Sequence, residues 1–139
     1  MFCRYILITE LSGKDILLAK KVLIVEDDFD FATSLELALD LIGYQAIIAA
    51  SAEIAQTVMA EMGGEITVGF FDIKLQGQDG IGCYEQIRET YPDFTGIVMT
   101  GFRDETLFER ARSVGIVEVL RKPFRMARFM ELVRRYAEA

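Results

Sequence analysis

The segment KVLIVEDD, residues 21–28, decides the fold of this chain. Its run VLIV at 22–25 consists of Leu and β-branched residues, which is typical of a strand covered on both faces. Three acidic residues follow at 26–28, and apolar residues then recur at helical spacing until Gly43, a favourable helix stop. The segment therefore predicts a buried strand that ends in a cluster of carboxylates and leads into a helix.

The same unit, a short apolar strand followed by a helix, repeats along the chain. Further strands are predicted at residues 45–49, 66–71, 96–100 and 117–120. The later helices are predicted from the cap Ser51 to Gly63, at about Ile81 to Thr90, at about Glu105 to Ser113, and along Met126, Phe129, Val133 and Tyr136. For the helix after Ser51, the inner face is predicted to be Ile54, Val58 and Met62. This alternation implies right-handed crossovers, a parallel sheet with helices on both faces, and thus an α/β, three-layer doubly wound (βα)5 sandwich.

Composition narrows the classes of function. The 139 residues suit one domain, and 15 Lys and Arg against 22 Asp and Glu give a formal charge of −7, which disfavours binding to nucleic acid or an anionic membrane. The chain has no histidine, which excludes Ser-His-Asp triads, Cys-His dyads and HExxH zinc sites. Cys3 and Cys83 stand far apart, and no apolar run approaches the roughly 18 residues of a membrane span. A cytoplasmic location is therefore expected.

Polar residues follow the predicted strands at the points where each strand ends. Glu26 and Asp27 come after the first strand, Asp72 after the third, Thr100 ends the fourth, and Lys122 follows the fifth. In open parallel sheets, ligands bind beyond these carboxyl ends. Two unit charges about 4 Å apart at an effective dielectric of about 20 repel by roughly 4 kcal/mol, and a hard divalent cation such as Mg²⁺ relieves this repulsion. Each residue alone has an ordinary structural explanation, but the set predicts phosphoryl chemistry.

Four blocks of the sequence resemble the signature blocks of the receiver domain of bacterial two-component response regulators. They are KVLIVEDD at 21–28, FFDIKLQGQDGI at 70–81, IVMTG at 97–101 and VLRKPF at 119–124. The resemblance covers residues 20–138 and implies a flavodoxin-like fold with a five-stranded parallel sheet in the order 2-1-3-4-5. It divides the chain into an N-terminal extension of unknown role, residues 1–20, and a receiver domain, residues 21–139. The extension could build a homodimer.

The resemblance also implies a role for each residue at the strand ends. Asp72 would be the phosphoacceptor, and Thr100 and Lys122 would contact the phosphoryl oxygens. The implied Mg²⁺ ligands are Asp27, Asp72, the backbone carbonyl of Lys74 and, mostly through water, Glu26.

The sequence departs from the family at two positions. Gln76 stands where a proline is frequent, and Val119 replaces the Tyr or Phe that usually rotates inward when the threonine moves. Lys74 and Phe102 occupy the positions that flank the path of hydrolytic water in the family, so bulky Phe102 is predicted to lengthen the phosphoryl lifetime. The Lys122–Pro123 bond is a candidate cis peptide, as the family commonly has there.

We therefore predict a single-domain response regulator without an output domain of its own. It would accept a phosphoryl group on Asp72 from the phosphohistidine of a sensor kinase or phosphotransfer protein, and relay the signal by conformational change to a partner protein. It would not be an enzyme beyond catalysing its own phosphorylation and dephosphorylation. One alternative is a degenerate receiver that only binds proteins, favoured by Gln76 and Val119. The other is a haloacid-dehalogenase-type phosphatase, which Lys74 and the motif order disfavour.

Overall fold

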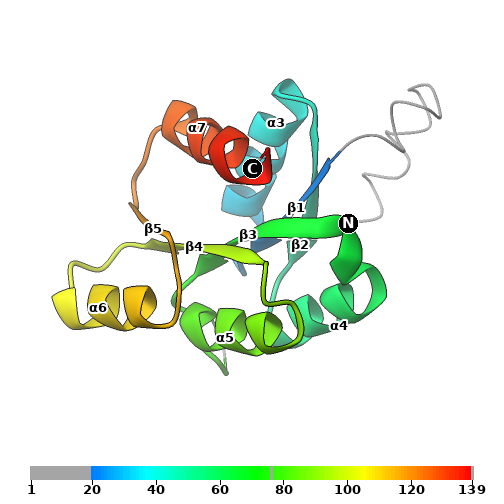
Figure 1. Ribbon diagram of the computed structural model, residues 1–139. Helices are drawn as coiled ribbons and strands as arrows, with labels where there is room; N and C mark the ends of the chain where they lie inside the picture. Colours follow the sequence, from blue (N-terminus) through cyan, green and yellow to red (C-terminus); the bar gives the residue numbers. More distant parts are fainter. Residues whose placement is uncertain (1–19, 76, 139) are drawn as a thin grey trace.

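The computed structural model describes residues 20–75 and 77–138 (Figure 1). The strands are β1 (Lys20–Val25), β2 (Tyr44–Ala49), β3 (Ile66–Asp72), β4 (Thr95–Thr100) and β5 (Glu118–Arg121). The helices are α3 (Phe29–Leu41), α4 (Ala52–Met62), α5 (Gly80–Thr90), α6 (Glu105–Ser113) and α7 (Met126–Ala137), with a short 3-10 turn at Gly63–Glu65. The predictions for Gln76 and for the extension, apart from Lys20 in β1, lie outside the described residues.

The five strands form one parallel sheet in the order β2-β1-β3-β4-β5. Helices α3 and α7 cover one face, and α4, α5 and α6 cover the other (Figure 1). The predicted doubly wound sandwich and its strand order are thereby confirmed. Within the described part of the chain, no helix combines the length and the apolar character needed to cross a bilayer.

Short polar side chains start α3, α4, α5 and α6, whereas α7 follows Arg125, whose side chain makes no capping hydrogen bond. Asp28, Ser51, Asp79 and Asp104 each accept a hydrogen bond from a backbone amide two or three residues further on. Such caps satisfy amides that have no partner within the helix. The cap at Ser51 was predicted, and so was the stop at Gly43, whose φ of +83° suits glycine. The cap at Asp79 makes Gly80 the first residue of α5, one residue before the predicted start.

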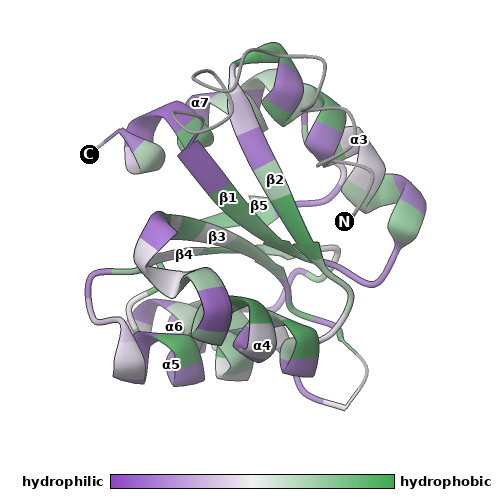
Figure 2. Cartoon of the chain, turned by 90° about the vertical axis from the view of Figure 1, so that its right-hand side faces the viewer, coloured by the Kyte–Doolittle hydropathy of each residue, from purple (hydrophilic) through white to green (hydrophobic). Residues whose placement is uncertain are grey.

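The sheet separates two apolar clusters. Residues 22–25 of β1 are fully buried, as predicted for a strand covered on both faces. Neighbouring side chains on a strand point to opposite faces of the sheet. The centre of the Phe70 ring therefore lies 4.7 Å from that of Phe129 in α7, whereas the centre of the Phe71 ring lies 5.9 Å from that of Tyr84 in α5. In Figure 2, β1 changes from hydrophilic at its start to hydrophobic along the rest of its length. Its buried part is therefore the centre of the core.

The predicted inner face of α4 is wrong in part. Val58 is buried, but Ile54 is 42% exposed and Met62 is only partly buried. The helix instead turns Ala52, Ala55 and Met59 toward the sheet. Both stripes are apolar in sequence, and the small alanines allow the closer approach of helix to sheet. The burial of Ala52, Ala55 and Met59 therefore decided which side of this helix faces the sheet.

Two glycines of α5 offer a matched test of how closely this helix approaches the end of β3. A Cβ at Gly80 would overlap the backbone carbonyl oxygen of Asp72, whereas at Gly82 its nearest neighbour is the flexible side chain of Gln78 at 3.3 Å. We expect Gly80→Ala to lower the free energy of unfolding by about 1–3 kcal/mol, as overpacking does. Gly82→Ala should instead raise it by up to about 1 kcal/mol through helix propensity. Chemical denaturation of both variants measures the difference, and equal effects would contradict the close approach at Gly80.

Candidate functional site

The parallel register brings the predicted site residues to one edge of the sheet. Asp72 pairs with Met99, which immediately precedes Thr100. Thr100 in turn pairs with Arg121, which immediately precedes Lys122. The predicted residues line one open pocket of about 670 Å³, and they are Glu26, Asp27, Asp72, Lys74, Thr100 and Lys122.

Three carboxylates lie at the centre of this pocket. Glu26 and Asp72 are buried and Asp27 is exposed, and one oxygen of each lies within 4.8 Å of the others. Such a set of oxygen donors suits a hard divalent cation such as Mg²⁺, and the open side of the pocket leaves room for its water ligands. The residues present therefore fit the metal that the sequence predicts.

The Lys122 ammonium is the nearest positive charge to these acids among the described residues. Its Nζ lies 2.7 Å from Glu26 Oε1 and 3.6 Å from Asp72 Oδ1, and 4.4 Å from the centre of the Phe31 ring. The Lys122 backbone amide donates to the Thr100 carbonyl oxygen at 2.8 Å, which continues the pairing of β5 with β4. The Lys122–Pro123 peptide bond is cis, as predicted.

Backbone amides orient the other polar side chains. Glu26, Asp72 and Thr100 each accept a hydrogen bond from the amide two residues later, at 3.2, 3.4 and 3.0 Å respectively. Local bonds of this kind hold a side chain against its own loop. Because the Thr100 hydroxyl accepts in this bond, its own proton stays available for a ligand in the pocket.

Burial is the main influence on Glu26. It raises the pKa of Glu26 to about 7, although the Lys122 ammonium and the Asp28 amide favour the charged form. The nearby Asp72 carboxylate raises the pKa further, because two close negative charges repel. A cation bound in the pocket would favour the charged form of Glu26.

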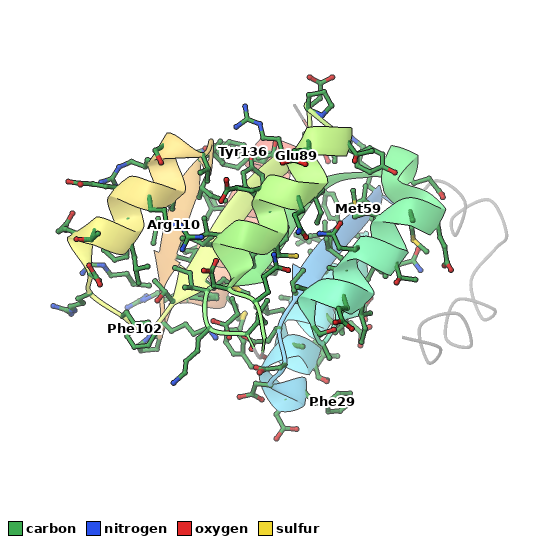
Figure 3. All side chains as sticks on the ribbon, turned by 90° about the horizontal axis from the view of Figure 1, so that it is seen from below. Phe29, Met59, Glu89, Phe102, Arg110 and Tyr136 are labelled. Atoms are coloured by element: carbon green, nitrogen blue, oxygen red, sulfur yellow. The ribbon has the colours of Figure 1, made fainter. Side chains whose placement is uncertain are left out.

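Two side chains flank the open side of the pocket. Phe102 is half-exposed in the loop after β4, where Figure 3 labels it, and the Lys74 ammonium lies 5.9 Å from the centre of its ring. Both residues line the pocket, as predicted from their positions in the sequence. Val119 is half-buried and packs into the cluster on the α5 and α6 side of the sheet.

The contact between Phe31 and Lys122 was not predicted from the sequence. Helical spacing places Phe31 on the core side of α3, and the structure half-buries it with its ring against Lys122. The contact joins residues 91 positions apart, which no local pattern reveals. Cys83, by contrast, is no candidate nucleophile, since burial raises the pKa of its thiol to about 12. Cys3 lies outside the described residues.

Comparison with known proteins gives consistent results. The sequence model of the response regulator receiver domain matches residues 22–134. Response regulator protein FleR of Pseudomonas aeruginosa is 32% identical over 120 residues, covering 86% of this chain and 25% of FleR. Sporulation initiation phosphotransferase F of Bacillus subtilis is 23% identical over 117 residues, covering 84% of this chain and 93% of that protein.

Solved structures agree with these sequence matches. A CheY-like response regulator receiver domain protein from Methanospirillum hungatei is similar with a TM-score of 0.78 and 26% identity, covering 86% of this chain and 94% of that one. The chain spans about a quarter of the length of the first curated relatives that it matches.

The carboxylate cluster predicts metal-dependent stability. At Mg²⁺ concentrations of about ten times Kd, binding should raise the free energy of unfolding by about 1.4 kcal/mol. Asp27→Asn should abolish most of this gain, because it removes an exposed ligand from the cluster. Asp30→Asn, which changes an acid outside the cluster, should keep it. Thermal unfolding with Mg²⁺ or with a chelator gives the comparison, and an equal gain in both variants would contradict a metal site at Asp27.

Proposed function

Because this chain belongs to the response regulator receiver domain family, we propose that Asp72 accepts a phosphoryl group from a phosphohistidine. Receiver domains of this family interact with histidine kinases or phosphotransferases in two-component phosphorelay systems. The observation that carries the proposal is the position of Asp72, with the Lys122 ammonium at 3.6 Å and with Thr100 in the same open pocket.

The transfer needs one nucleophile and a site that stabilises charge. An Asp72 carboxylate oxygen attacks phosphorus, and the new O–P bond forms as the P–N bond to the histidine breaks. The bonding electron pair returns to the imidazole nitrogen. The product is an acyl phosphate on Asp72. In this proposal the chain acts on no separate substrate and catalyses only its own phosphorylation and dephosphorylation.

Each neighbour of Asp72 has a distinct role in this reaction. The Lys122 ammonium offsets negative charge on the phosphoryl oxygens, and the Thr100 hydroxyl donates its proton to one of them. Mg²⁺ held by Asp27, Asp72 and the Lys74 carbonyl, with Glu26 acting through water, would supply further positive charge at these oxygens. The support for the ligand set is the grouping of the three carboxylates within 4.8 Å.

The signal would leave the site through the loop after β4. The Thr100 hydroxyl accepts a hydrogen bond from the Phe102 amide, so a threonine that turns toward the phosphoryl group changes this loop and the start of α6. Val119 has no ring that could rotate, which favours movement of backbone and helix instead. A partner protein would read this change, and the location that we propose for the chain is the cytoplasm.

Of the two alternatives, one keeps a specific observation in its favour. A degenerate receiver that only binds proteins is supported by Val119, which removes the usual aromatic switch residue. The haloacid-dehalogenase alternative loses its ground, because the chain belongs to the receiver family over residues 22–134. Phosphorylation of Asp72 therefore separates the remaining candidates.

Incubation with Mg²⁺ and acetyl phosphate tests the proposal. Intact-protein mass spectrometry should find one added phosphoryl group on the wild type and none on Asp72→Asn, which lacks the nucleophile. Lys122→Met should react much more slowly, because the phosphoryl charge loses its nearest ammonium. A folded wild-type protein that binds Mg²⁺ but gains no phosphoryl group would refute phosphorylation and favour the binding module.

Removal of the Phe102 ring should shorten the lifetime of the phosphorylated protein. Phe102→Ala opens the mouth of the pocket to water, so we expect hydrolysis of the acyl phosphate to become several-fold faster. Phe29→Ala is the matched control, since Phe29 is 75% exposed and does not line the pocket. The decay of phosphorylated protein after donor removal gives the rates. An unchanged rate in Phe102→Ala would rule out shielding by this ring.

A further inference from the structure

The Lys122 ammonium has a third neighbour besides the two carboxylates. Its Nζ lies 4.4 Å from the centre of the Phe31 ring, within the range at which a cation is attracted to the negative face of an aromatic ring. The Lys122 side chain is about three-quarters buried, so water screens this attraction only in part. Phe31 is therefore an energetically relevant part of the lysine's surroundings.

Phe31 is itself held from two sides. Its backbone amide donates to the carboxylate of the cap Asp28 at 3.1 Å, which fixes the first turn of α3. Its ring packs edge to face with the Phe124 ring at 5.7 Å and 76°. Phe124 comes two residues after Lys122, so one ring contacts both residues that flank Pro123.

The contact extends into the core through further aromatic rings. Phe124 stacks with Phe129 of α7 at 6.4 Å, and Phe129 packs against Phe70 of β3 at 4.7 Å. Phe129 and Phe70 are fully buried. This row of rings connects the lysine to the cluster between the sheet and α7, and it leaves the Phe31 ring little freedom to move away.

An aromatic ring and a carboxylate would hold an ammonium with different consequences. A carboxylate accepts N–H bonds and neutralises the charge that a phosphoryl group needs, as Glu26 does here at 2.7 Å. A ring face attracts the cation without neutralising its charge and without accepting a conventional N–H hydrogen bond from it. The ammonium beside Phe31 thus keeps donors free, and Asp72 lies 3.6 Å away on its other side.

We propose that Phe31 is a positioning residue for Lys122, whose ammonium it holds where a phosphoryl group on Asp72 can be reached. The inference rests on the proposed function of Asp72. In this proposal the Phe31 ring affects phosphotransfer only through Lys122. Phe31 touches neither donor nor phosphoryl group in this scheme.

Rates of phosphorylation by acetyl phosphate with saturating Mg²⁺ test the role of the ring. Phe31→Leu keeps an apolar side chain without a ring face, and the rate should fall about five-fold, the size expected for one cation–π contact. Phe31→Tyr keeps the ring and should retain the wild-type rate. Phe29 lies in the same helical turn, and its exposed ring points away from the body of the molecule in Figure 3. Phe29→Leu removes this ring and should leave the rate unchanged.

Two outcomes of the rate measurement would overturn the proposal: a wild-type rate in Phe31→Leu, or a rate in Phe31→Tyr as low as in Phe31→Leu. A nuclear magnetic resonance measurement separates this failure from failure of the proposed function. Ring current should shift the Lys122 ε-methylene signal in the wild type and in Phe31→Tyr, and the shift should vanish in Phe31→Leu.

This signal is read without phosphorylation, with thermal unfolding as a check on the fold. If the wild type accepted no phosphoryl group, the proposed function would fail while the signal still showed whether the ring holds the lysine. An identical ε-methylene signal in wild type and Phe31→Leu would overturn the positioning role.

Discussion

The Lys122 ammonium between the Glu26 and Asp72 carboxylates is the interaction on which the site depends. Two acids that are buried within one pocket repel, and the cost rises because little water surrounds them. One ammonium offsets part of this repulsion but cannot satisfy the three carboxylates of the cluster. The remaining negative charge is of the kind that a divalent cation could offset. The Asp72 carboxylate also adds to burial, the larger cause, in raising the pKa of Glu26.

The position of Asp72 in this group of charges depends on close backbone packing between the end of β3 and the start of α5. The amide of Gly80 donates to the Ile73 carbonyl oxygen at 2.9 Å, and the glycine lies so near the Asp72 carbonyl that no side chain fits between them. The loop after β3 is therefore folded back tightly on the end of its strand. This turn and the sheet register fix the backbone of Asp72 at the strand end, where its carboxylate lies 3.6 Å from the Lys122 ammonium.

The two faces of the sheet contribute differently to the site. On the side of α3 and α7, aromatic rings from Phe31 to Phe70 connect the lysine to a fully packed core. On the other side, the Phe102 amide in the loop between β4 and α6 donates a hydrogen bond to the Thr100 hydroxyl. Packed rings resist displacement, whereas the exposed loop of residues 101–104 lies outside the core and moves more easily. This difference accords with the proposal that the signal leaves the site on the α6 side.

The sequence by itself determined the order of strands and helices along the chain, the buried central strand and most of the charged and polar residues that line the pocket. These features follow from short apolar runs, capping residues such as Ser51, and the rule that parallel strands present their carboxyl ends at one edge. Only the tertiary structure decided which stripe of α4 faces the sheet, and that Phe31 lies against Lys122. Both outcomes come from packing between segments distant in sequence, where the shapes of opposing surfaces select among contacts that local patterns allow equally.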